Sequence, residues 1–180
     1  MSETNPPIKE SSAWYIVYTK PRAEKKLSEL LTKYHLENYV PIRKERKKWT
    51  DRFKWIHTPI LPSYIFVKIV FWKDKNKVLQ LPGSHHFVFH KGQPATVSQE
   101  ELDQLEEGLQ KYADSLKVSP ESILEKGKLV RIVSGPMFGK TMEILKVKNK
   151  TLVVLRFPGI DAAVSYEINV DHLAWEELIV

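Results

Sequence analysis

One short segment of this chain has apolar side chains on both of its expected faces, and it constrains the fold more than any other stretch. The segment runs from Pro59 to Ile69 and alternates from Ser63 onward. In a strand, one face carries Tyr64, Phe66 and Lys68, and the other carries Ile65, Val67 and Ile69. A half-buried antiparallel strand usually keeps one polar face, so this strand has surplus apolar surface. Its second face must be covered by another element or serve as a contact surface.

Composition limits the class of protein. The 180 residues include 42% hydrophobic and 28% charged residues and suit one large domain or two small ones. There is no cysteine, which excludes disulfides and thiolate metal sites and makes a reducing cytoplasm the expected location. No apolar run is long enough to span a membrane. Residues 1–12 are polar, contain two prolines and are expected to form a disordered lead.

Charge is distributed unevenly along the chain. Residues 13–58 hold twelve Lys/Arg against five Asp/Glu, a net of +7, although the whole chain carries only +6. Residues 97–125 hold eight acids against two bases, a net of −6. Such asymmetry is typical of oriented binding to a polyanion. Solvated faces that only keep the protein soluble would explain the charges equally well.

Strand and helix patterns alternate over the first 112 residues. Strands are predicted at 14–18, 37–41 and 86–89, and helices after Pro21, over 71–81 and behind Ser98. The sequence from Arg43 to Lys48 is too charged for a core element and predicts a hairpin arm, with 49–58 returning from it. These elements are expected to build one mixed or antiparallel sheet with helices.

The pattern changes after a polar stretch. Periodicity lapses near residues 113–122, which predicts a linker. Short β segments follow at 129–133, 142–147, 152–157 and 164–168, separated by turn residues, and indicate a small barrel. The expected fold class is therefore α+β. Its expected parts are the lead at 1–12, a domain at 13–113, a linker at 114–124 and a barrel domain at 125–180.

Three blocks of this sequence resemble the NusG family of transcription elongation factors. They are Trp14–Lys26, Leu61–Lys68 and Gly127–Gly139, and they occur in the family's order and spacing. The resemblance implies an N-terminal NGN domain, an α/β sandwich, joined to a C-terminal KOW β-barrel, and covers about residues 13–177. The first block and the basic arm look more like specialised paralogs, antiterminators of the RfaH and UpxY type that act on particular operons, often for surface polysaccharides.

The same resemblance implies a binding site for RNA polymerase. In the family, the NGN domain binds the clamp helices of the polymerase through an apolar depression. By position in the motifs, this depression would be lined by Tyr18, Leu61, Tyr64 and Phe66. Buried aromatic side chains are common anchors of protein interfaces. The alternative is that these four residues simply form the core of a small domain.

Two basic sets are candidates for nucleic-acid binding. Lys20 and Arg22 lie at the junction of the first strand and helix, which family likeness places near the non-template DNA strand of the transcription bubble. The second set occupies the arm: Arg43, Lys44, Arg46, Lys47, Lys48 and Arg52, with Trp49 among them and Lys54 beyond. Cations beside an exposed aromatic ring suit a single strand, whose bases can stack on the ring. The alternative is a solvated hairpin with Trp49 or Trp55 packed on the sheet.

No metal site, cofactor or enzymatic chemistry is predicted. His85, His86 and His90 would alternate faces on a strand, so all three cannot face one ion, and no cysteine completes a ligand set. They are expected at a sheet edge instead. No nucleophile, phosphate-binding loop or carboxylate pair indicates catalysis.

The C-terminal block departs from the KOW pattern in two places. Gly135, Pro136 and Gly139 match it, but Met137 takes the usual aromatic place and Met142 stands where a glycine is expected. In the family this barrel recruits a termination factor or a small-subunit ribosomal protein, and either remains open here. Local preference favours strands over a helical refolded form. The second function considered is an RNA-binding or ribosome-associated KOW module. A monomer without membrane association is expected in either case.

Overall fold

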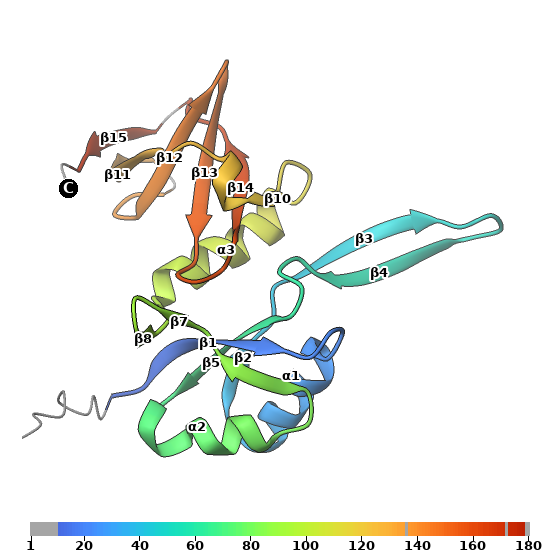
Figure 1. Cartoon of the computed structure of the whole chain (residues 1–180). Coiled ribbons are helices and arrows are strands. Elements are labelled where there is room, and N and C mark those ends of the chain that lie inside the picture. The colour runs from blue at the N-terminus through green and yellow to red at the C-terminus, as the bar shows by residue number, and fades with distance from the viewer. Residues whose placement is uncertain (1–10, 136, 172, 179–180) are drawn as a thin grey trace, which may run out of the picture. The chain divides into compact units, whose positions relative to one another are not determined.

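The computed structural model describes residues 11–135, 137–171 and 173–178, so the predicted disordered lead at 1–12 lies almost wholly outside the described residues. The chain divides into two compact units (Figure 1). The first comprises the chain up to Val40 together with Leu61–Ser98, and the second comprises Pro41–Ile60 and the chain from Gln99 onward. Among the described helices, none has the length and apolar character needed to cross a bilayer.

The first unit is built on an antiparallel sheet. Its strands run in the order β2 (Glu37–Tyr39), β5 (Tyr64–Ile69), β1 (Ala13–Thr19) and β6 (Ser84–Phe87), and the short β9 (Thr96–Val97) also pairs with β1. A small ribbon of β7 (Phe89–His90) and β8 (Gln93–Pro94) follows β6. Helix α1 spans Glu24–Lys33 and α2 spans Phe71–Gln80. The predicted strands and helices of this unit are therefore present.

The aliphatic face of β5 lies in a core beneath both helices. The sheet contributes Tyr15, Val17, Ile65, Val67, Ile69 and Phe87, and the helices contribute Leu27, Leu31, Phe71 and Val78. Phe71 packs between two of these rings, 4.9 Å from Tyr15 and 5.0 Å from Phe87 between centroids. Burying each large apolar side chain contributes about 1.5–3 kcal/mol, so this core stabilises the unit.

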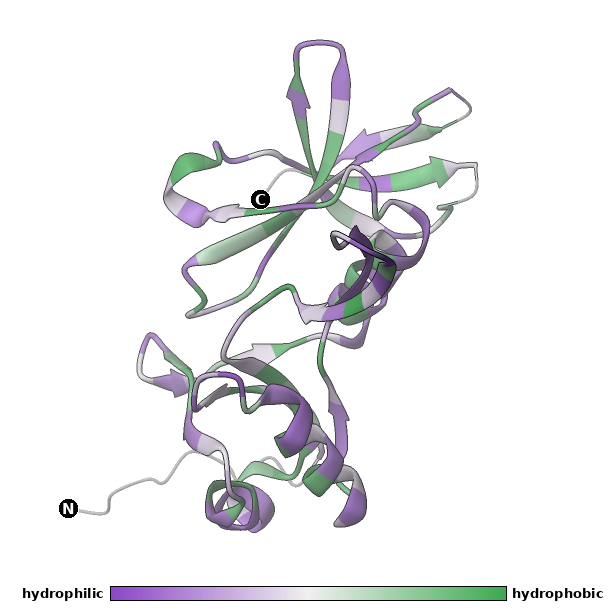
Figure 2. Ribbon diagram, turned by 90° about the vertical axis from the view of Figure 1, so that its right-hand side faces the viewer, coloured by the Kyte–Doolittle hydropathy of each residue, from purple (hydrophilic) through white to green (hydrophobic). Residues whose placement is uncertain are grey.

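The second unit is rich in β structure. Its six-stranded antiparallel sheet runs in the order β10, β14, β13, β12, β11 and β15. Their bounds are β10 Lys117–Pro120, β11 Lys128–Ser134, β12 Thr141–Val147, β13 Lys150–Arg156, β14 Ala162–Ile168 and β15 Ala174–Glu177. A 3₁₀ turn at Glu121–Ile123 follows β10. Figure 2 shows hydrophobic and hydrophilic residues alternating along ribbons of the molecule, as strands with one buried face require.

Helix α3 (Gln99–Lys111) packs on this C-terminal sheet and forms hydrogen bonds with it. The Tyr166 hydroxyl donates a hydrogen bond to the Gln104 carbonyl at 3.2 Å, and the Gln104 side-chain amide donates to the Thr141 carbonyl at 2.7 Å. Burial raises the pKa of Tyr166, so its hydroxyl stays a donor. Gly108 permits the contact, because a Cβ there would lie 2.7 Å from the Tyr166 ring. The predicted domain boundary at residue 113 stays a prediction. Residues Gln104 and Gly108 of α3 nevertheless contact Thr141 and Tyr166 of the C-terminal sheet.

Part of the segment assigned to a linker is a strand. Lys117–Pro120 forms β10, which pairs with Ala162–Ser165 of β14 at the edge of the sheet. An edge strand exposes half of its backbone groups and one side of its pleat, so it tolerates polar residues and a terminal proline. The weak hydrophobic pattern there had indicated no regular structure.

Candidate functional site

The ends of three strands in the first unit gather a group of four rings, which we call the sheet-end cluster: Tyr18, Tyr64, His85 and His86. The register places Tyr18 opposite both Tyr64 of β5 and His86 of β6. The Tyr18 ring lies 5.3 Å from Tyr64, nearly edge-on, and 5.1 Å from His86. Tyr18 and Tyr64 are half-buried, and both histidines are exposed. The cluster therefore exposes aromatic edges at the surface, and contacts between its rings fix their orientation.

Backbone hydrogen bonds fix the loops around this cluster. Thr19 N–H donates to the Ser63 carbonyl and Lys20 N–H to the Gly83 carbonyl, each at 2.8 Å. The buried Glu24 carboxylate accepts a bond from the Ser63 N–H at 2.6 Å. Ser63 adopts a φ of 66°, and this acceptor helps hold it in that sparsely populated region. Lys20 and Arg22 are both exposed and lie directly after Tyr18, on a loop that these hydrogen bonds hold in place.

The four predicted polymerase-binding residues differ in exposure. Tyr18 and Tyr64 keep accessible surface, whereas Leu61 is 1% exposed and Phe66 is fully buried. Tyr39 of β2 stacks on Phe66, with 6.3 Å between ring centroids and 27° between planes. Phe66 and Leu61 therefore occupy core positions in this structure, as the alternative interpretation of these residues held. Contact of any of the four with a partner stays a prediction.

The two neighbouring histidines do not alternate as a regular strand requires. The β1–β6 register shifts between Tyr18 and Thr19, so His85 is an extra residue at a β-bulge. The bulge turns the His85 ring beside His86, with their Nδ1 atoms 2.7 Å apart. Although His86 is exposed, partial desolvation of its ring, and secondly its charge interaction with His85, lower the pKa of His86. The two lie on edge strand β6 as predicted, His90 belongs to β7, and the described residues form no metal-binding group.

The basic arm is a two-stranded ribbon. Strands β3 (Ile42–Lys48) and β4 (Phe53–Pro59) pair in register from Ile42–Pro59 at the base to Lys48–Phe53 at the tip. Directly opposed residues of an antiparallel pair share a face. One face, which we call the aromatic face, carries Lys44, Arg46, Lys48, Phe53, Trp55 and His57. The opposite face, which we call the charged face, carries Arg43, Glu45, Lys47, Lys54, Ile56 and Thr58.

Exposure distinguishes the aromatic face from an ordinary strand surface. Phe53 is 56% exposed and Trp55 is 62% exposed. The Arg46 guanidinium lies 4.2 Å from the centre of the Phe53 ring. Trp49, in the turn, is 55% exposed, with the Lys54 ammonium 5.9 Å from its ring. Neither Trp49 nor Trp55 is therefore buried within the second unit, and the hairpin is solvated, as the alternative of a solvated hairpin held.

Arg43 and Lys47, predicted with the nucleic-acid set, lie on the charged face and interact within the protein. Arg43 pairs with Glu45 at 3.4 Å and donates to the Leu116 carbonyl, while Lys47 lies 3.8 Å from Glu45. Arg52 lies in the turn, where its carbonyl accepts from Trp49 N–H. Phe53 and Trp55 were not among the predicted site residues. Their two-residue spacing opposite alternating cations was the sequence signal that could have identified them.

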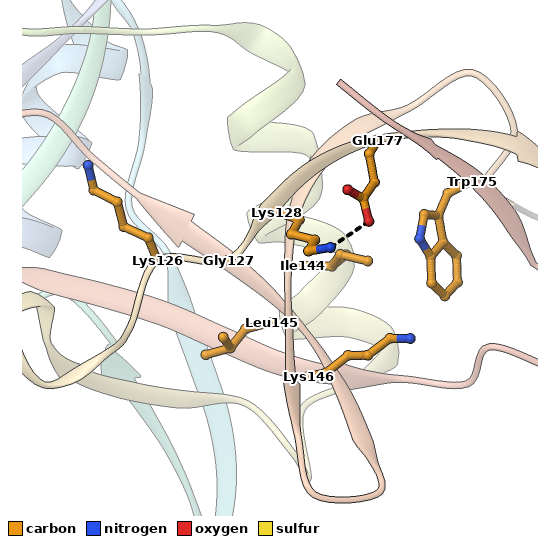
Figure 3. Close-up of a pocket in the computed structure, with 8 residues that line it drawn as sticks. All are labelled: Lys126, Gly127, Lys128, Ile144, Leu145, Lys146, Trp175 and Glu177. Carbon is orange, nitrogen blue, oxygen red and sulfur yellow. Dashed lines mark hydrogen bonds and ion pairs between the residues drawn. The ribbon is translucent and has the colours of Figure 1, made fainter. Parts of the chain in front are cut away.

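A second cation–aromatic surface occurs in the C-terminal unit (Figure 3). A cavity of about 270 Å³ is lined by Lys126, Gly127, Lys128, Ile144, Leu145, Lys146, Trp175 and Glu177. The Lys146 ammonium lies 5.5 Å from the Trp175 ring centre, and Lys128 pairs with Glu177 at 2.7 Å. Gly127 lets the chain pass close to β12, because a Cβ there would meet the Ile144 carbonyl oxygen at 2.3 Å. Anionic ligands fit this surface, with one lysine already neutralised.

The departures from the KOW pattern have structural consequences. Met137 is 3% exposed and fills an interior position, whereas Phe138 beside it is 73% exposed. Gly139 has a φ of 83°, and its N–H donates to the Ile132 carbonyl, so the turn forms. Met142, at the expected glycine, is 3% exposed and is the second residue of a regular β12. The turn therefore does not require a glycine at that position in this chain.

Comparisons with known proteins found a family model, curated relatives and a solved structure that are similar to this chain. A family model described as NusG, transcription termination factor nusG, matches residues 12–106, more than half of the chain. The transcription termination/antitermination protein NusG of Rickettsia felis is 26% identical over 187 residues, covering 92% of this chain and 91% of the relative. Its Helicobacter pylori namesake is 26% identical over 161 residues, covering 77% and 85%. A solved structure described as domain interaction in Thermotoga maritima NusG covers 91% of this chain and 96% of that chain, with 22% identity and a TM-score of 0.47.

The family model and the curated relatives agree with each other and with the α+β fold. The predicted fold class and the prediction of a non-enzymatic transcription protein are thereby confirmed. This chain belongs to the NusG family of transcription termination and antitermination factors.

Proposed function

We propose that the protein is an elongation or antitermination factor whose first unit binds the clamp helices of RNA polymerase. The observation that carries the proposal is the sheet-end cluster, where the accessible edges of Tyr18 and Tyr64 adjoin a pinned basic loop. Aromatic anchors with fixed geometry lose little entropy on binding. Leu61 and Phe66 support this surface from within the core. The protein acts in the cytoplasm, as a monomer.

Lys20 and Arg22 contact non-template DNA of the transcription bubble in this proposal. Both are exposed and lie on the loop that follows Tyr18, so a partner at the cluster would place them beside the polymerase surface. Phosphate contacts made by such cations are independent of sequence and weaken with salt. The basic arm adds further cations. Together these contacts suppress pausing or termination.

The experiment is binding of the full-length protein to purified core RNA polymerase. Exchanging Tyr18 and Tyr64 together for alanine is expected to weaken binding by roughly tenfold or more, since a single interface anchor can contribute about 2 kcal/mol or more. Trp72→Ala is the matched control, because Trp72 is also an exposed aromatic residue of the first unit. Equal binding by the double variant and the control would contradict the proposed interface.

We also propose that the protein acts at particular operons, such as those for surface polysaccharides, in the manner of specialised RfaH- or UpxY-type paralogs. The support is the likeness of residues 14–26 and of the basic arm to those paralogs. Chromatin immunoprecipitation of the tagged protein tests this. Enrichment at one operon is expected, whereas signal that follows polymerase genome-wide would indicate a general factor.

The basic cavity at Trp175 favours a second candidate function, an RNA-binding or ribosome-associated C-terminal unit. Lys126 and Lys146 with an aromatic ring can hold an anionic strand, although Glu177 already pairs with Lys128. A termination factor or a small-subunit ribosomal protein is the alternative partner of this unit. Loss of RNA binding in Trp175→Ala, with polymerase binding unchanged, is the result expected of the second function. Unchanged RNA binding would reject it.

A further inference from the structure

We infer that the β3–β4 hairpin binds single-stranded nucleic acid through its aromatic face alone. Bases stack on Phe53 and Trp55, while phosphates are bound by Lys44, Arg46 and Lys48. This inference rests on the proposed placement of the arm near nucleic acid. It goes further by naming one face of the ribbon, the strandedness of the ligand and two residues that contact its bases.

The exposed rings carry the first step. Phe53 and Trp55 are each more than half exposed on a ribbon whose two strands pair only with each other among the described residues. Large apolar rings on such a surface are not packed in a core. They therefore expose apolar area to water and add little to the stability of the fold. Stacking of a base on such a ring contributes about 1–3 kcal/mol and tolerates any base sequence.

Charge separates the two faces. Each cation of the aromatic face lies opposite a ring: Lys44 opposite His57, Arg46 opposite Trp55 and Lys48 opposite Phe53. Glu45, the acid within the two strands, lies on the charged face and interacts there with Arg43 and Lys47. An anion approaching the aromatic face therefore meets cations without a carboxylate across the strand pair. On the charged face it meets Arg43 and Lys47, which already interact with Glu45, and Lys54, which lies beside the Trp49 ring.

The spacing of the rings suits separated bases. Residues two apart on one strand lie about 7 Å apart, roughly the width of two van der Waals contacts. A flat base can therefore enter between Phe53 and Trp55 or stack on the outer side of either. The Arg46 guanidinium, 4.2 Å from the Phe53 ring centre, extends that stack with a positive charge.

Strandedness follows from this mode of binding. The bases of a duplex are paired and stacked on each other, so their faces are not available to Phe53 or Trp55. A duplex can use only the cations. The rings must therefore account for a preference for single strands, whereas the cations act on both kinds of ligand.

The test measures binding of the full-length protein to a labelled single-stranded DNA, to the same sequence as a duplex and to single-stranded RNA. The wild type is expected to prefer single strands. Exchanging Phe53 and Trp55 together for alanine is expected to weaken single-strand binding at least about tenfold and duplex binding less than about threefold. Ile56→Ala is the matched apolar control on the charged face, and unfolding curves confirm that each variant is folded.

A second pair of variants tests the cations. Lys48→Ala is expected to weaken binding of all three ligands and to lower the slope of log K against log salt by about one. Lys47→Ala, one residue away on the charged face, is expected to do neither. Similar losses from Lys47→Ala and Lys48→Ala, or an unchanged single-strand affinity without both rings, would overturn the inference.

The ligand arms separate this inference from the proposed function on which it rests. If the wild type binds none of the three ligands, the nucleic-acid part of the proposed function and the inference both fail. If single strands are bound but only Lys20→Ala and Arg22→Ala weaken binding, the proposed function stands and the inference fails. Equal effects of the ring variant on DNA and RNA identify strandedness as the recognised property. An effect on one of them identifies the sugar as well.

Discussion

The sheet-end cluster and the aromatic face of the hairpin both combine rings with cations, but they are supported in different ways. The Tyr18 and Tyr64 rings pack on each other, and the loops beside them are held by Glu24 and by backbone hydrogen bonds. Phe53 and Trp55 are more than half exposed on a two-stranded ribbon. Changes near the cluster should therefore alter stability along with binding. Changes on the hairpin should alter binding alone.

The largest expected effect on stability is at the buried position of the Tyr64 strand. Phe66→Ala removes a fully buried ring and should lower the free energy of unfolding by about 3–5 kcal/mol. Tyr64→Ala, two residues earlier and partly exposed, should cost roughly 1 kcal/mol. Denaturant unfolding followed by circular dichroism measures both. Equal losses of unfolding free energy in the two variants would mean that Phe66 is not a core residue. The cluster would then lack core support, as the hairpin rings do.

A smaller effect is expected at the loop that the cluster depends on. Glu24→Ala leaves the Ser63 N–H without its acceptor and should cost about 1–3 kcal/mol. Glu24→Gln keeps an acceptor oxygen and should cost less, while Glu29→Ala, exposed on the same helix, serves as the control. If all three variants unfold at the same denaturant concentration, the loop is not held by Glu24.

The histidines should give a modest pH effect. Because burial and His85 lower the pKa of His86, the unfolded chain binds that proton more readily than the folded chain. The contribution of His86 to stability is therefore present above the unfolded pKa, about 6.5, and is lost as pH falls through the lower folded pKa. His85→Ala should raise the pKa of His86 only in part, since burial is the larger cause. An NMR titration of the His86 ring protons measures this, and an unchanged pKa would contradict the contact.

The smallest effect on stability is expected from the hairpin rings. Phe53→Ala and Trp55→Ala should each change the free energy of unfolding by less than about 0.5 kcal/mol, because neither ring contributes to a core. The same denaturant experiment applies. A loss above about 1 kcal/mol in either variant would show that the rings have a structural role, and the comparison with the cluster would fail.

Much of the fold follows from local patterns in the sequence. The alternation at Ile65, Val67 and Ile69 predicted the face that packs under the helices, and the four predicted C-terminal strands are all present. The histidine pair was harder. Regular alternation would separate His85 from His86, but a β-bulge brings them together, and no local pattern indicated the bulge.

The candidate sites were predicted less completely than the fold. Tyr18 and Tyr64 face each other at one end of the first sheet, and Lys20 and Arg22 lie on the loop that follows Tyr18, while their contacts with partners stay a prediction. The arm was predicted as a single basic set, yet its register divides Arg43 and Lys47 from Lys44, Arg46 and Lys48. Alternation along β3 produces that division, and the register across the turn decides which β4 residues share each face. The turn between Trp49 and Arg52 sets this register, and charge content alone does not reveal it.

The sequence by itself determined the family, the main strands and helices and the alternation of the strand at Tyr64–Ile69, because period and motif spacing are local properties of the chain. Only the tertiary structure decided that Phe66 is buried while Tyr64 keeps accessible surface, and that α3 packs on the C-terminal sheet. These outcomes depend on residues far apart in sequence, such as Tyr39 against Phe66 and Tyr166 against Gln104. Whether a side chain is buried depends on which other elements pack against it. The alternation of a strand indicates only which side chains share a face.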